Sequence, residues 1–171
     1  MKVIVAGLGV QGYRRRKNAG KDYIYSVDPV NSEADYRNIS DVPLNSYDAV
    51  MVCTPDKPKV ELTKYALANS KHVLLEKPLW ADQDGDIDKL QRLARKNEVV
   101  CYIAYNHRFE PHFIRMRDLI ESGKLGEIYS CRIFYGNGTA RLVRDSKWRD
   151  KGGGVLPDLG SHLLDTCRFW F

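Results

Sequence analysis

Short apolar segments rich in valine and isoleucine recur along the first hundred residues. They cover residues 2–6, 23–27, 49–53, 72–75 and 99–104. Between them lie segments with the mixed polar and apolar pattern of helices, at residues 11–19, 59–69 and 82–97. Near-continuous apolar strands that alternate with helices are typical of a parallel sheet covered on both faces. The pattern therefore predicts an α/β fold for residues 1–104.

The organisation changes from Tyr105 onward. Residues 110–122 have a helical pattern, residues 127–136 (EIYSCRIFYG) predict one strand, and a final helix follows a polar loop. One strand alone leaves its backbone donors and acceptors unpaired. We therefore expect residues 105–171 to be the start of an incomplete α+β second domain. A truncated chain, a short form completed by another chain, and a module that only binds a cofactor are the three interpretations, in that order.

Composition excludes several classes of protein. With 43% hydrophobic and 29% charged residues, the chain is an ordinary globular sequence. It has neither a signal-type N-terminus nor the roughly 18 consecutive apolar residues of a membrane span, so we expect a cytoplasmic protein without membrane contact. Four widely spaced cysteines form no C-x-x-C pair, and no metal site is predicted. The basic run Arg14–Lys17 is interpreted as a solvated helix face, not as a nucleic-acid site.

A glycine motif lies between the first strand and the first helix. Gly7, Gly9 and Gly12 form G-x-G-x-x-G, and Asp28 ends the next strand about twenty residues later. This context indicates a Rossmann-type dinucleotide site, with the pyrophosphate at the helix N-terminus beside Val10 and Gln11. Asp28 would accept hydrogen bonds from both ribose hydroxyls. Because a carboxylate repels a 2′-phosphate, NAD is predicted in preference to NADP, which the nearby arginines keep as the alternative.

One connection departs from an ordinary Rossmann half. Only five residues separate Asp28 from a further strand expected around residues 34–36. A parallel crossover normally needs a dozen residues or more. We therefore predict an irregular connection without a crossover helix, which leaves the adenine side of the cofactor site more open.

Further motifs make the sequence resemble a known family. Thr54-Pro55 follows the third apolar strand, Glu76-Lys77-Pro78 follows the fourth, and YNHRFEP and GGGVLPDLGSHLLD come later, at residues 105–111 and 152–165. Together they resemble the Gfo/Idh/MocA family, named after glucose-fructose oxidoreductase and inositol dehydrogenase, over essentially the whole chain. The resemblance implies a second domain with an open, mainly antiparallel sheet that is commonly used in oligomer contacts.

The resemblance also implies a set of site residues. Lys77, Asp158 and His162 would be catalytic and meet at the nicotinamide, with Pro78 commonly after a cis bond. The implied cofactor contacts, with the glycine motif included, are Gly7, Gly9, Val10, Gln11, Gly12, Asp28, Cys53, Thr54, Pro55, Glu76, Lys77 and Asn106. The family often carries a histidine four residues after the proline of Thr-Pro. This sequence has Lys59 there, so no cofactor contact is carried over to that position.

The chemistry of these catalytic residue types suits alcohol oxidation independently of the resemblance. A hydroxyl proton must leave as hydride leaves carbon, and His162 is the predicted general base. A fixed cation stabilises the developing alkoxide, which suits Lys77, although a lowered pKa would let Lys77 act as the base. Asp158 would orient His162 or hold a substrate hydroxyl. His107 is interpreted as structural, and Arg108 either contacts nicotinamide or substrate or forms an interdomain salt bridge.

The predicted function is an oxidoreductase that transfers a hydride between NAD(P) and a secondary hydroxyl or keto group. Its substrate would be a small molecule: a sugar, a cyclitol or a nucleotide sugar. A full-length form is expected to be a homo-oligomer. The alternative is a catalytically silent dinucleotide-binding module or fragment whose missing sheet is supplied by another chain.

Overall fold

The structure, a computed structural model, describes residues 1–81, 83–136 and 156–171. The glycine run at 152–154 and the polar loop before it lie outside the described residues. The chain divides into two compact units, Met1–Ala104 and Tyr105–Phe171, and each is described by itself. None of the described helices is both long enough and apolar enough to cross a membrane.

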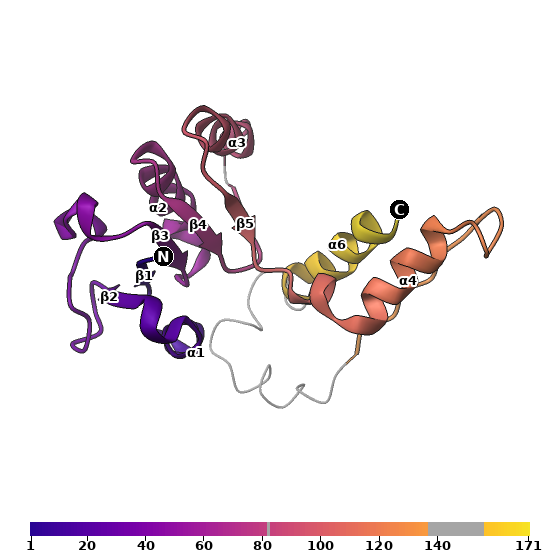
Figure 1. Cartoon of the computed structure of the whole chain (residues 1–171), viewed down its shortest axis with the longest axis horizontal. Helices are drawn as coiled ribbons and strands as arrows, with labels where there is room; N and C mark the ends of the chain where they lie inside the picture. The colour runs from indigo at the N-terminus through magenta and orange to yellow at the C-terminus, as the bar shows by residue number, and fades with distance from the viewer. Residues whose placement is uncertain (82, 137–155) are drawn as a thin grey trace. The chain divides into compact units, whose positions relative to one another are not determined.

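A five-stranded parallel sheet forms the centre of the first unit (Figure 1). Its strands stand in the order β2-β1-β3-β4-β5, and each neighbouring pair is parallel. Their bounds are Val3–Ala6 for β1, Tyr23–Val27 for β2, Ala49–Val52 for β3, His72–Leu75 for β4 and Cys101–Ile103 for β5. The predicted Rossmann-type sheet and its five strands are confirmed.

Helices follow three of these strands, as the sequence pattern predicts. They are α1 at Val10–Ala19, α2 at Asp56–Ala68 and α3 at Asp86–Lys96. Helix α2 begins three residues earlier than predicted, because the proline in its first turn is compatible with a helix start. Helix α3 begins four residues later than predicted, directly after Gly85.

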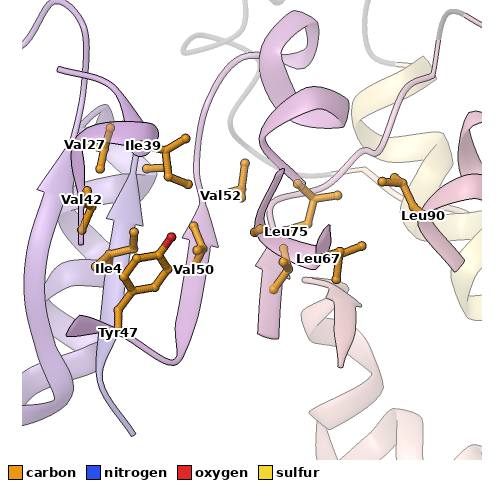
Figure 2. Close-up of a cluster of buried hydrophobic side chains, with 13 residues drawn as sticks. Ile4, Val27, Ile39, Val42, Tyr47, Val50, Val52, Leu67, Leu75 and Leu90 are labelled. Carbon is orange, nitrogen blue, oxygen red and sulfur yellow. The ribbon is translucent and has the colours of Figure 1, made fainter. Parts of the chain in front are cut away.

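The core of the first unit lies around the sheet (Figure 2). All four residues of β1 are buried, and Val50, Val52 and Leu75 of the neighbouring strands are completely inaccessible. Leu67 of α2 and Leu90 of α3 complete the cluster. Burial of each such side chain contributes about 1.5–3 kcal/mol. The apolar contacts hold α2 against β3 and β4 and hold α3 against α2.

The connection between β2 and β3 is irregular, as predicted. It contains 3₁₀ turns at Ile39–Asp41 and Leu44–Ser46 and, among the described residues, no α-helix. The strand expected at 34–36 is reduced to a single parallel bridge between Val27 and Tyr36. Buried side chains, not a crossover helix, attach this connection to the core, and they are Ile39, Val42 and Tyr47.

The carboxylate of Asp35 anchors the same connection to β2. It accepts hydrogen bonds from the Ser26 amide and hydroxyl, both at 2.7 Å, and from the Tyr23 hydroxyl at 3.1 Å. Burial by itself would raise the pKa of Asp35, but these hydrogen bonds outweigh it and the pKa lies below its ordinary value. The ionised carboxylate therefore ties the connection to two residues of β2, Tyr23 and Ser26.

The second unit is helical in its described part. It contains a 3₁₀ turn at Asn106–Phe109, α4 at Pro111–Glu121, a π-helical turn at Leu156–Gly160 and α6 at Ser161–Trp170. The indole Nε1 of Trp170 donates to the carbonyl of Phe113 at 3.0 Å, which joins α6 to α4.

The prediction of a strand at residues 127–136 is wrong. None of these ten residues is in a strand, and Tyr129 and Phe134 are 86% and 92% exposed. A strand is stable only when its backbone groups pair with a neighbour, and the described part of this unit provides none. The final helix is confirmed, but it is preceded by the π-helical turn that holds Asp158.

Replacing Asp35 by asparagine is expected to lower the free energy of unfolding at pH 7 by at most about 1 kcal/mol, because three hydrogen bonds to a charged acceptor are weakened at an exposed position where water screens the charge. Folding lowers the Asp35 pKa, so its contribution to stability is fully present at pH values well above the ordinary pKa of 3.8 and disappears as the pH falls through the folded-state pKa. Wild type should therefore lose more stability than D35N between about pH 5 and pH 2. Urea unfolding across this range measures the difference.

The matched control is D22N. Asp22 is about half exposed and contacts the N-terminal amine at 3.5 Å, so its replacement should change stability little. Parallel stability curves for wild type and D35N would show that the Asp35 carboxylate does not anchor the connection.

Candidate cofactor and catalytic site

The residues predicted to bind the cofactor in the first unit share one edge of the sheet. Gly7 follows β1, Asp28 follows β2, Cys53 follows β3 and Glu76 follows β4. The carboxyl ends of parallel strands lie together, and ligands of open α/β sheets bind there. The topology therefore brings these predicted residues to the position where a dinucleotide would bind.

Gly7 and Gly12 allow a tight turn between β1 and α1. Gly7 has a φ of +94°, a conformation that favours glycine, and its amide donates to the Val27 carbonyl at 2.8 Å. A Cβ atom on Gly12 would lie 1.9 Å from the Gly7 carbonyl oxygen. No side chain fits there, so α1 starts directly against the end of β1.

The second glycine of the motif, Gly9, has open space around it. Gly9 precedes α1, and a Cβ atom built on it would have no atom within 4 Å. Within the residues that the structure describes, no side chain caps the start of α1. The first amides of a helix lack partners inside the helix and carry partial positive charge. The open space and these amides fit the pyrophosphate of a dinucleotide.

Asp28 is bonded to the glycine turn itself. Its Oδ2 accepts from the Leu8 amide, and its Oδ1 accepts from the amides of Val30 and Asn31, all at 2.8 Å. Burial would raise the Asp28 pKa, but the amide hydrogen bonds outweigh it and lower the pKa. A carboxylate has about four acceptor positions. Three are occupied, so this arrangement leaves room for one of the two ribose hydroxyl bonds that we predicted.

Asn31 holds the same turn from the other side. Its Nδ2 donates to the Leu8 carbonyl and to the Tyr13 hydroxyl, each at 3.0 Å. The peptide groups of Leu8 are therefore bonded at both the amide and the carbonyl. Sequence analysis did not single out Asn31, because its role depends on contacts with residues 18 and 23 positions away.

Cys53 and Thr54 lie behind the glycine turn, at the end of β3. The Cys53 amide donates to the Ala6 carbonyl at 2.7 Å. Burial, with a contribution from the Glu76 carboxylate, raises the pKa of the Cys53 thiol to about 12. Thr54 has a buried hydroxyl oxygen that finds no hydrogen-bond partner among the described residues. Both residues follow β3 at the carboxyl end of the sheet, and their contact with the cofactor stays a prediction.

Glu76, Lys77 and Pro78 follow β4, and basic side chains hold this segment. The Arg15 guanidinium of α1 contacts Glu76 Oε1 through Nε at 2.6 Å and through Nη2 at 2.5 Å. The Lys77–Pro78 peptide bond is cis, as the resemblance implies. Lys59 of α2 is buried against the same segment. Lys77 itself is half-buried.

His162 is buried in the second unit among aromatic rings. Its ring centroid lies 4.7 Å from that of His107, 5.7 Å from Tyr105 and 6.1 Å from Tyr135. Asp158 precedes it in the π-helical turn, where the Asp158 carbonyl accepts from the Ser161 hydroxyl at 3.2 Å. The surrounding rings limit the orientations open to the imidazole of His162.

His107 contacts the predicted base, which sequence reasoning did not foresee. Its Nδ1 lies 2.6 Å from Glu110 Oε1, and its ring stacks on Phe113 at 5.0 Å. The spacing of 55 residues between His107 and His162 carries no local signal. Asn106, a predicted cofactor contact, lies at the start of the same turn with Nδ2 3.5 Å from Glu110 Oε1.

Arg108 forms a bidentate salt bridge with Asp165. Its Nε and Nη2 donate to the two carboxylate oxygens at 2.8 and 2.6 Å. Asp165 is buried, and both residues belong to the second unit. This salt bridge lies within one unit and is not the interdomain bridge that we considered for Arg108.

The predicted catalytic residues are divided between the two units. Lys77 belongs to the first, and Asp158 and His162 belong to the second. Their meeting at the nicotinamide stays a prediction. In the described ranges 1–81, 83–136 and 156–171, no cluster of histidine, cysteine and acidic residues could hold a metal ion.

Two family models match the chain along most of its length. Residues 2–105 match the oxidoreductase family with an NAD-binding Rossmann fold, and residues 113–171 match the GFO/IDH/MocA C-terminal domain. The boundary between the two matches falls in the same region as the boundary between the two compact units.

Curated relatives are longer than this chain. The scyllo-inositol 2-dehydrogenase (NADP(+)) IolW of Bacillus subtilis is 32% identical over 127 residues, which are 72% of this chain and 35% of that protein. Glucose-6-phosphate 3-dehydrogenase of the same organism is 26% identical over 168 residues, 91% of this chain and 47% of that protein. The chain therefore spans less than half the length of these relatives.

Solved structures share the fold. The scyllo-inositol dehydrogenase of Lactobacillus casei, solved with NAD(H) and scyllo-inositol, matches with a TM-score of 0.80 at 24% identity over 99% of this chain and 56% of its own. The myo-inositol 2-dehydrogenase of Lactobacillus plantarum gives a TM-score of 0.82 at 17% identity, over 99% of this chain and 56% of its own. Together with the family matches, these findings show that the chain belongs to the Gfo/Idh/MocA oxidoreductase family and begins with its NAD-binding Rossmann domain.

Proposed function

We propose that the protein containing this chain transfers a hydride between NAD(P) and a secondary hydroxyl or keto group of a sugar, a cyclitol or a nucleotide sugar. The observation that carries the proposal is the common position of the glycine turn, Asp28 and Lys77 at one edge of the sheet. The relatives named as inositol and glucose-6-phosphate dehydrogenases support a polyhydroxylated substrate.

The first unit supplies the cofactor-binding groups. When bound, the nicotinamide supplies the hydride acceptor or donor. The amides at the start of α1 would bind the pyrophosphate, and the remaining acceptor position of Asp28 would bind a ribose hydroxyl. Because its pKa is lowered, Asp28 carries a full negative charge at neutral pH. That charge favours NAD over the 2′-phosphate of NADP, although one relative is named for NADP(+).

Two side chains are assigned to the substrate oxygen, one to take its proton and one to stabilise its negative charge. In the direction of oxidation, the His162 imidazole would take the hydroxyl proton, and the Lys77 ammonium would stabilise the negative charge that develops on the oxygen. Asp158 would orient the substrate or the imidazole. The ring of His107, held by Glu110, packs against His162 and restricts its rotation.

Substitution of two glycines separates cofactor binding from folding. G9A adds a Cβ atom to open space, so we expect the fold to remain while NADH affinity falls about tenfold or more, because the atom intrudes on the pyrophosphate position. G12A should lose both stability and binding, because its Cβ atom would lie 1.9 Å from the Gly7 carbonyl. Fluorescence titration with NADH and thermal unfolding of the 171-residue chain measure both effects.

Unchanged NADH affinity in a folded G9A variant would contradict this cofactor position. D28A offers an independent check, since it removes the carboxylate that accepts a hydrogen bond from the Leu8 amide and would accept one from a ribose hydroxyl. NAD affinity that does not fall in D28A would show that the ribose binds elsewhere.

Substitution of His162 or Lys77 tests the chemistry. In the full-length protein, H162A and K77A should each lower kcat about 100-fold or more while the Kd for NADH changes little, because both act on the substrate oxygen. The assay follows NADH formation from NAD and a panel of cyclitols, sugars and nucleotide sugars. His112 is 73% exposed, and H112N is the matched control with unchanged kcat.

Unchanged turnover in H162A or K77A would remove that residue from the catalytic set. If the wild-type full-length protein binds NADH but turns over no member of the panel, the silent dinucleotide-binding module becomes the better description.

A further inference from the structure

Lys59 is a buried cation that the proposed reaction does not use. It lies in the first turn of α2, and its side chain is 3% exposed. Its Nζ lies 2.8 Å from the Pro78 carbonyl oxygen, 2.8 Å from Asp56 Oδ1 and 3.5 Å from the Lys77 carbonyl oxygen. An ammonium group has three donors, and these three acceptors match that number.

Helix stability does not account for a lysine at this position. The start of a helix carries partial positive charge and disfavours a cation. Burial of the ammonium group adds a desolvation cost that paired charges often fail to recover relative to apolar residues of similar size. Asp56 offsets part of that cost, but Asp56 is itself largely exposed. The buried contact with the Pro78 carbonyl is the feature that distinguishes Lys59 from the other lysines of α2.

The segment that Lys59 contacts contains Lys77. Strands β3 and β4 are paired up to Val52 and Leu75, so the helix that follows β3 starts beside the residues that follow β4. The Glu76 side chain is held by Arg15 of α1. Two helices therefore hold this segment, α1 through the Glu76 carboxylate and α2 through the backbone carbonyls of Lys77 and Pro78.

We propose that Lys59 is a positioning residue, whose ammonium group fixes the backbone carbonyls of Lys77 and Pro78 and thereby holds the Lys77 side chain in place for the reaction. The proposal rests on the function proposed above for Lys77. Lys59 need not touch cofactor or substrate. Loss of its contact should affect the chemical step more than binding, because a small displacement of a catalytic group reduces rate steeply.

Three variants test this proposal. K59M removes the donors and keeps an apolar stem of similar length, and K59R keeps a positive charge and hydrogen-bond donors. K64M is the matched control, because Lys64 lies on the same helix, is 49% exposed and contacts Glu61 at 3.8 Å. If K59M does not fold, K59Q takes its place with the same expected outcomes.

Hydrogen–deuterium exchange on the 171-residue chain measures local opening of the backbone and does not require enzymatic activity. In K59M we expect the peptide that covers residues 76–80 to exchange at least about tenfold faster, while peptides from β1 and α3 keep their wild-type rates. K64M should match wild type throughout. Wild-type exchange at residues 76–80 in folded K59M would overturn the proposal.

Kinetics of the full-length protein read the consequence for catalysis. K59M should lower kcat about tenfold or more with a KM for substrate and a Kd for ADP-ribose within about twofold of wild type, and K59R should recover part of kcat. A K59M variant with lowered thermal stability but unchanged kcat would show that Lys59 is only structural.

The two proposals can fail separately. If K77A keeps full turnover, the assigned role of Lys77 fails, and the exchange experiment still decides whether Lys59 fixes the segment. If K77A loses turnover but K59M keeps it, the function stands and the positioning role of Lys59 is rejected.

Discussion

The close contact between Gly12 and the carbonyl of Gly7 is the constraint on which the first unit depends. It lets α1 start directly against the end of β1, and it fixes the direction in which the first amides of the helix point. The glycine turn is then bonded to β2 through Gly7 and Asp28 and to β3 through the Cys53 amide and the Ala6 carbonyl. A single short turn thus determines the relative position of three strand ends and one helix.

Charged groups near this turn are held by partners from other elements. The carboxylate of Asp28 is held by backbone amides, and that of Glu76 by the guanidinium of Arg15. Hydrogen bonds to a charged acceptor are strong, and at half-buried positions they also restrict side-chain motion. The carboxylates at this edge of the sheet are therefore fixed by their partners, and the space at Gly9 is left open beside the first amides of α1.

Local pattern was enough to predict the elements of the first unit and the helices of the second, but not the absence of the predicted strand at 127–136. The five strands and three helices follow from apolar segments such as 72–75 and from the helix signals between them. The glycine motif in its strand–helix context identified the glycine turn, and the family resemblance implied the cis bond before Pro78. The strand at 127–136 failed because strand formation depends on a distant partner, not on alternation. Contacts such as Arg15 with Glu76 and His107 with His162 join residues more than 50 positions apart, and no periodicity encodes them.

The raised pKa of Cys53 makes the thiol at this edge of the sheet resistant to oxidation and alkylation. Only the thiolate is readily oxidised or alkylated, and a thiol with a pKa of about 12 is almost entirely protonated at neutral pH. Cys131, by contrast, is exposed. The Cys53 thiol is therefore a poor target for oxidants, and thiol reagents should react with the exposed Cys131 of the second unit before they react at the end of β3.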